Sequence, residues 1–220
     1  MKNLSENVKD ARSAQSYRSW ITALATDQRG LLTSAQARRL GVSSNQLCYL
    51  VADETLKRVN NGVYRLSAAA PDSYSEVRAL WMRLEPKSTT AERLARSDPG
   101  GVLAHRTAAA MHRLGHFRCD AVEFAVQSER KSRRPGVRLY QSDLSRSEWT
   151  VIDGLPVTTV LATTRDLAQS SIGDDDFAKV VRDALLTHHL DLSTIGVGTT
   201  RHANNPDTTS SSQPIRTPPI

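Results

Sequence analysis

Between residues 31 and 66 the apolar positions follow first helical and then strand spacing. Residues 33–41 and 43–51 each begin with the Ser/Thr-x-x-Gln pattern of a capping box, followed by apolar residues three or four positions apart, which predicts two short helices joined by a tight turn. Residues 56–66 contain two β-branched and aromatic runs around Asn61-Gly62, which predicts a β-hairpin. Helix, turn, helix and hairpin in this order predict a winged helix-turn-helix.

An amphipathic helix is expected before this unit. Tyr17, Trp20, Ile21 and Leu24 fall at i, i+3, i+4 and i+7, so these four side chains should form one face that packs under the winged helix-turn-helix. Further helices are expected near residues 77–84, 90–96, 107–114, 161–169 and 174–190. Strands are expected at residues 102–104, 122–126, 137–140, 149–152 and 157–160, with 137–140 returning beside 122–126 and the last two forming a hairpin.

The longest of these helices has the clearest apolar face, a continuous stripe of Phe177, Val180, Val181, Ala184, Leu185 and His188. We therefore expect an α+β protein in three parts. Residues 1–70 form the winged helix-turn-helix domain, residues 71–192 a mixed α/β domain, and residues 193–220 a disordered tail rich in Thr, Ser, Asn and Pro. The Ala-rich run at residues 67–71 marks the junction between the first two parts.

The distribution of charge favours a polyanionic partner. The net charge is +6, and residues 1–70, with ten basic and five acidic side chains, contribute +5 of it. Cys48 and Cys119 lie far apart and match no metal or redox spacing. No stretch of the sequence is apolar over a length that spans a bilayer, and a cytoplasmic location is expected.

The predicted winged helix-turn-helix presents side chains that suit double-stranded DNA. Asn and Gln on the outer face of the second helix can pair bidentately with adenine, and basic side chains on the hairpin and the first helix suit phosphate oxygens. The candidates for base contacts are Ser44, Asn45, Gln46 and Tyr49. The candidates for wing and backbone contacts are Arg38, Arg39, Lys57, Arg58, Asn61 and Arg65. The alternative is that the winged helix serves as a protein-docking module, as the same fold does in other proteins, and that these basic side chains are only solvated.

Two further groups of polar residues have simpler explanations than catalysis. Asp174–Asp176 with Lys179 fits helix capping, and His105, His112 and His116 lack the Cys or carboxylate ligands of a zinc site. We expect no catalytic residue, metal or cofactor.

The loop at residues 127–136 is a candidate partner-binding site for phosphate, RNA or an acidic face, although such runs are often only solvated. Its basic residues are Arg130, Lys131, Arg133 and Arg134.

Two sets of motifs resemble the AbiEi-type antitoxins. The first set consists of Thr33, Ala37, Gly41, Leu47, Leu50-Val51, Leu56, Arg58-Val59 and Gly62–Leu66. The second set consists of Leu103–Ala109, Leu114-Gly115, Gly136–Leu139, Leu155–Thr158 and Asp166-Leu167. The likeness extends over residues 31–190, with one departure: Ala162 stands where the family usually has Arg.

The resemblance implies an antitoxin of a bacterial type IV toxin–antitoxin pair, encoded beside a nucleotidyltransferase-like toxin. Its winged helix would bind inverted repeats in its own promoter and repress the operon, and its second domain would counteract the toxin. Whether the two proteins touch varies in the family. The alternatives are a ligand-responsive winged-helix regulator and a relative of nuclease-fused modules that lacks the nuclease.

Overall fold

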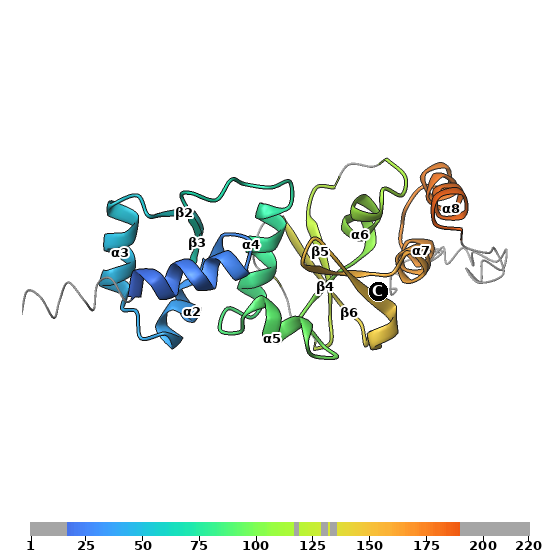
Figure 1. Cartoon of the computed structure of the whole chain (residues 1–220). Coiled ribbons are helices and arrows are strands. Elements are labelled where there is room, and N and C mark those ends of the chain that lie inside the picture. Colours follow the sequence, from blue (N-terminus) through green and yellow to red (C-terminus); the bar gives the residue numbers. More distant parts are fainter. Residues whose placement is uncertain (1–16, 117–118, 129–131, 133–135, 190–220) are drawn as a thin grey trace, which may run out of the picture.

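A computed structural model of the chain describes residues 17–116, 119–128, 132 and 136–189. The described part is elongated (Figure 1), with a winged helix-turn-helix at one end and a group of three helices at the other. A five-stranded sheet and two helices lie between them. The mixture of helices and mainly antiparallel strands confirms the predicted α+β class.

The winged unit, defined here as residues 17–66, contains the three helices and the hairpin that the sequence predicts. A helix over residues 17–27 precedes the other elements. These are β1 (Leu31–Thr33), α2 (Ser34–Arg39), α3 (Ser44–Ala52), β2 (Leu56–Asn60) and β3 (Val63–Leu66). Both predicted capping boxes are present, and Gly41 and Gly62 have φ of +78° and +73°, as the helix end and the hairpin turn require. Strand β1, which the pattern of residues did not predict, pairs with β3 to complete a three-stranded sheet of order β1-β3-β2.

The predicted packing face of the helix over residues 17–27 is wrong at one position. Trp20 is 51% exposed, whereas Ile21 and Ala25 are fully buried. A helix turns by about 100° per residue, so a stripe centred on Ile21 and Ala25 leaves Trp20 at its margin. Leu24 and Tyr17 pack against the core of the winged unit, as predicted.

The C-terminal part, defined here as residues 71–189, contains a second sheet and the remaining described helices. Its helices are α4 (Ser75–Leu84), α5 (Thr90–Leu94), α6 (His105–His112), α7 (Val160–Gln169) and α8 (Asp174–His188), with a 3₁₀ turn at Arg146–Glu148. Its strands are β4 (Val102–Leu103), β5 (Val122–Val126), β6 (Val137–Gln141), β7 (Trp149–Ile152) and β8 (Leu155–Thr158). Some elements, such as α6 and β8, begin two residues earlier than predicted.

The strand order of this sheet is β6-β5-β4-β8-β7. The predicted hairpin of β7 and β8 forms around Asp153-Gly154, where both residues have positive φ. Strand β6 lies beside β5, as predicted for the returning strand, but it runs parallel to β5 and not as the second strand of a hairpin, with Val122 opposite Val137. The intervening segment is long enough to carry the chain back to the start of β5, and spacing alone does not reveal that path.

Two apolar clusters fill the C-terminal part. In the first, Trp81 of α4 packs with Phe124 of β5, and the same cluster includes Leu31 and Val63 of the winged unit. At the far end, α6, α7 and α8 pack around Phe177, Val180 and Ala184, which confirms the predicted stripe on α8. The first cluster therefore joins the winged unit to the C-terminal part through shared burial.

Several expectations lie outside the described residues. They concern the tail at residues 193–220 and the basic side chains Arg130, Lys131, Arg133 and Arg134. Within the described ranges, no helix combines the length and the hydropathy needed to cross a membrane.

Candidate nucleic-acid interface

Helix α3 presents a polar face to solvent, as predicted. Leu47 and Leu50 are buried, whereas Ser44, Asn45 and Tyr49 are exposed, and Tyr49 exposes 67% of its surface. No hydrogen bond is found for the Asn45 side chain in the part of the chain that the structure describes. Asn45 is therefore available to pair with a base edge in a major groove.

Gln46 is in a different position from Asn45. Its side-chain Oε1 accepts a hydrogen bond from the Ser43 backbone N–H at 2.8 Å, which is one half of the capping box. A bidentate pair with adenine needs both the oxygen and the nitrogen of an amide. Gln46 must therefore either give up this cap or contact a base through Nε2 alone.

The wing carries its cations on adjacent strands. Lys57 of β2 lies directly opposite Arg65 of β3, and like charges in this position destabilise a sheet. An anion beside the pair relieves that repulsion, so the arrangement suits a DNA phosphate. Arg58 is exposed and donates a hydrogen bond from Nη2 to Asn61 Oδ1 at 3.0 Å, which holds the guanidinium at the tip of the wing.

The wing is short and its tip lies against neighbouring elements. The carbonyl of Gly62 accepts a hydrogen bond at 2.9 Å from the backbone N–H of Ser34, the first residue of α2. Asn60 Oδ1 accepts a hydrogen bond from Arg83 of α4. The tip is therefore fixed between α2 and α4.

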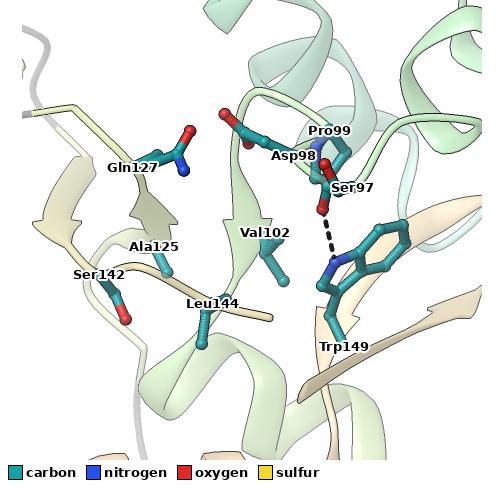
Figure 2. Close-up of a pocket in the computed structure, with 9 residues that line it drawn as sticks. All are labelled: Ser97, Asp98, Pro99, Val102, Ala125, Gln127, Ser142, Leu144 and Trp149. Carbon is teal, nitrogen blue, oxygen red and sulfur yellow. Dashed lines mark hydrogen bonds between the residues drawn. The ribbon is translucent and has the colours of Figure 1, made fainter. Parts of the chain in front are cut away.

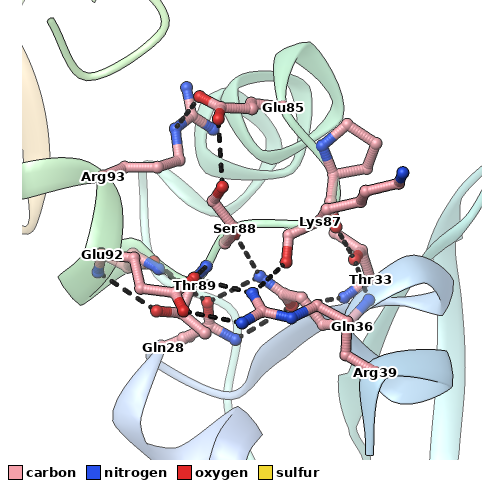
Figure 3. Close-up of polar contacts among 12 residues, drawn as sticks. Gln28, Thr33, Gln36, Arg39, Glu85, Lys87, Ser88, Thr89, Glu92 and Arg93 are labelled. Carbon is pink, nitrogen blue, oxygen red and sulfur yellow. Dashed lines mark hydrogen bonds and ion pairs between the residues drawn. The ribbon is translucent and has the colours of Figure 1, made fainter.

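Arg38 and Arg39 of α2, both candidates for backbone contacts, have different surroundings. Arg38 is exposed, and no ion pair is found for it among the described residues. Arg39 forms a bidentate pair with Glu92 of α5, with Nη1–Oε2 and Nη2–Oε1 distances of 2.8 and 2.9 Å. It also donates to the carbonyl of Lys87 at 2.7 Å (Figure 3). The hydrogen bonds from Arg39 lower the pKa of Glu92 to about 2.

A buried pair of amides joins the winged unit to α5. Gln28 and Gln36 are each 2% exposed, and each donates from Nε2 to the Oε1 of the other, at 3.1 and 3.0 Å (Figure 3). Every remaining hydrogen-bonding position of the two amides is taken by a backbone group. These groups are Leu31 C=O, Thr33 N–H, Ser88 C=O and Thr90 N–H. Sequence reasoning identified Gln36 only as a capping residue and gave no sign of Gln28, because their partners lie 52 and 62 positions away.

Two of the candidate histidines of the C-terminal part, His105 and His112, have structural partners. His105 lies against Tyr140 with ring centroids 4.1 Å apart and ring planes tilted by 46°, and the His112 ring forms a hydrogen bond with the carbonyl of Thr158 at 2.7 Å. Asp174–Asp176 form the first turn of α8, where their charges suit the helix dipole, but the N-cap is Gly173 and it makes no side-chain cap, so the predicted capping role is not observed. In the described ranges, no three His, Cys, Asp or Glu side chains are arranged to hold a metal ion.

A small cavity lies beside the middle strand β4 of the second sheet (Figure 2) and is lined by Val102, Ala125 and Trp149 among others. Its volume is about 10 Å³, which is room for a single water. The indole N–H of Trp149 donates to the carbonyl of Ser97 at 3.2 Å across one side of it. The cavity is therefore too small to bind an organic ligand.

The predicted base-reading and phosphate-contacting residues thus lie on one winged unit, and within the described ranges Arg39 is the one among them that bonds to the C-terminal part. Comparison with curated proteins gives no match. Residues 21–67 match a protein family described as "Transcriptional regulator, AbiEi antitoxin". That range ends one residue after β3, and the likeness predicted for residues 103–190 lies beyond it. Over its winged helix-turn-helix, the chain therefore matches the AbiEi antitoxin family of transcriptional regulators, as the motifs of the sequence predict.

Proposed function

We propose that this chain is the antitoxin of a type IV toxin–antitoxin pair and represses its own operon by binding inverted repeats in its promoter. Asn45, Ser44 and Tyr49 contact base edges, while Gln46 contributes through the free end of its amide. The backbone contacts come from Arg38, Arg39, Lys57, Arg58, Asn61 and Arg65. The observation that carries the proposal is the solvent-facing amide of Asn45 on a capped helix within the region that matches a family of transcriptional regulators.

The test of DNA binding uses the full-length chain and two duplexes, one from the region upstream of its gene and one with the same bases scrambled. Neutralisation of about five or six phosphates gives a log K against log salt slope near −5. We expect preferential binding to the upstream duplex with a slope of this size. Equal affinity for the two duplexes, or no dependence on salt, contradicts the proposal.

We further propose that residues 71–192 counteract a nucleotidyltransferase-like toxin, with residues 1–70 as the DNA-binding part and no catalytic step performed by the chain. The toxin is the protein encoded beside this chain. The full chain should restore growth to cells that express this toxin. Reversal of the four charges at Arg130, Lys131, Arg133 and Arg134 tests whether the basic loop docks it, because charge reversal abolishes electrostatic docking. Growth arrest that persists with the wild-type chain contradicts the antitoxin role.

A further inference from the structure

The ion pair between Arg39 and Glu92 has the geometry of a phosphate contact. The guanidinium meets the carboxylate through two parallel N–H···O hydrogen bonds, which is also how arginine recognises a phosphate group. The two side chains are 50% and 41% exposed, so a DNA strand can reach the pair without unfolding the joint. Glu92 thus satisfies Arg39 in the way that a phosphate would.

The ion pair is not what holds α5 against the winged unit. That contact is made by the buried amides of Gln28 and Gln36 and by the apolar cluster around Trp81. Thr33 adds a hydrogen bond from its hydroxyl to the carbonyl of Pro86. An exposed ion pair adds little to this contact, so Arg39 can exchange partners while the joint stays closed.

The surroundings of Arg39 favour an approaching phosphate. Arg38 precedes it on α2, and Lys87, whose carbonyl holds Arg39, is itself exposed. No ion pair is found for the Lys87 ammonium in the part of the chain that the structure describes. In a helix-turn-helix the helix before the recognition helix crosses the DNA backbone, and here that helix is α2.

We propose that Glu92 takes the place of a DNA phosphate on Arg39 in the free protein, and that the DNA backbone displaces it when α3 enters the major groove. The turn between α4 and α5, at residues 85–89, then belongs to the edge of the DNA interface. This inference rests on the proposed DNA-binding function. Its consequence is that a partner which shifts α5 also changes the affinity of the winged unit for DNA.

The experiment compares Glu92→Gln with Glu76→Gln in the full-length chain. Glu76 is an exposed carboxylate on α4 with no ion pair among the described residues, so its substitution removes one negative charge without touching Arg39. Dissociation constants are measured by fluorescence anisotropy on the upstream duplex. We expect Glu92→Gln to bind about 2- to 5-fold more tightly than Glu76→Gln, the factor that loss of a competing exposed pair gives.

A double-mutant cycle assigns the gain to Arg39. In an Arg39→Ala background, Glu92→Gln should leave the dissociation constant unchanged, because the cation for which Glu92 competes is absent. Thermal unfolding of each variant shows whether the fold is kept, and since all three side chains are exposed, we expect midpoints near that of the wild type.

The outcomes separate this inference from the proposed function. Equal affinity of Glu92→Gln and Glu76→Gln overturns the inference, and so does a gain that survives in the Arg39→Ala background. If the wild-type chain still prefers the upstream duplex in either case, the DNA-binding function stands. If the wild-type chain shows no such preference, the function and the inference fail together.

Discussion

Substitution of Gln28 by alanine should loosen the joint between the winged unit and α5. The Gln28 amide makes two bonds to Gln36, accepts from the Thr90 backbone N–H at 2.9 Å and donates to the Leu31 carbonyl at 3.2 Å. Its removal leaves these partly buried groups short of a partner, and each such buried orphan costs roughly 1–3 kcal/mol. Since Gln36 keeps its bonds to Thr33 and Ser88, we expect a loss of about 2–4 kcal/mol in the free energy of unfolding.

The assay is urea denaturation followed by circular dichroism, with thermal unfolding beside it. For a chain of this size, 1 kcal/mol moves the midpoint temperature by about 2–4 °C, so a fall of roughly 4–16 °C is expected. Gln169→Ala, at the exposed end of α7, is the matched control and should stay within about 0.5 kcal/mol of the wild type. A Gln28→Ala loss no larger than that of the control would refute the idea that this amide pair fixes the joint.

The remaining predictions concern DNA reading, the core and pH. Asn45→Ala should lose about 1–3 kcal/mol of binding free energy on the upstream duplex alone, while Arg58→Ala should weaken binding to the upstream and scrambled duplexes alike. If Asn45→Ala loses equal affinity for both duplexes, a residue other than Asn45 reads the bases in the groove. Ile21→Ala should destabilise the chain by about 2–4 kcal/mol, and Trp20→Ala, at an exposed side chain, by under about 1 kcal/mol, as measured by chemical denaturation. A larger loss for Trp20→Ala than for Ile21→Ala would contradict the packing described for that helix. The pKa of Glu92 is lowered from 4.5 to about 2, so its pairing with Arg39 stabilises the fold above pH 4.5 and this contribution is lost as the pH falls toward 2. The difference in unfolding midpoint between wild type and Glu92→Gln, which we expect to be small because the pair is exposed, should therefore be constant from pH 8 to 5 and shrink below about pH 4. A change between pH 8 and 5 would point to another titrating group.

Local chemistry alone was enough to predict the two helices of the helix-turn-helix and the hairpin of the winged unit. Each capping box, the helix-ending glycine and the Asn-Gly turn involve only residues a few positions apart in the sequence. They therefore form without any long-range contact. The stripe on α8 was predictable for a related reason, because helical periodicity places its apolar residues on one side whatever they pack against. Helical periodicity also predicts the residues of α3 that are proposed to contact DNA, because they occupy the positions outside its apolar face.

The tertiary structure decided what depends on distant partners. The parallel direction of β6, the strand pairing of β1 and the burial of Gln28 each depend on segments that the chain brings together only on folding. The exposure of Trp20 likewise depends on where the core of the winged unit lies. Arg39 shows the difference most clearly. Its sequence neighbours mark it as a cation on a DNA-binding helix, but only the fold places Glu92, 53 residues away, against it, because an ion pair forms wherever the backbone brings opposite charges within reach.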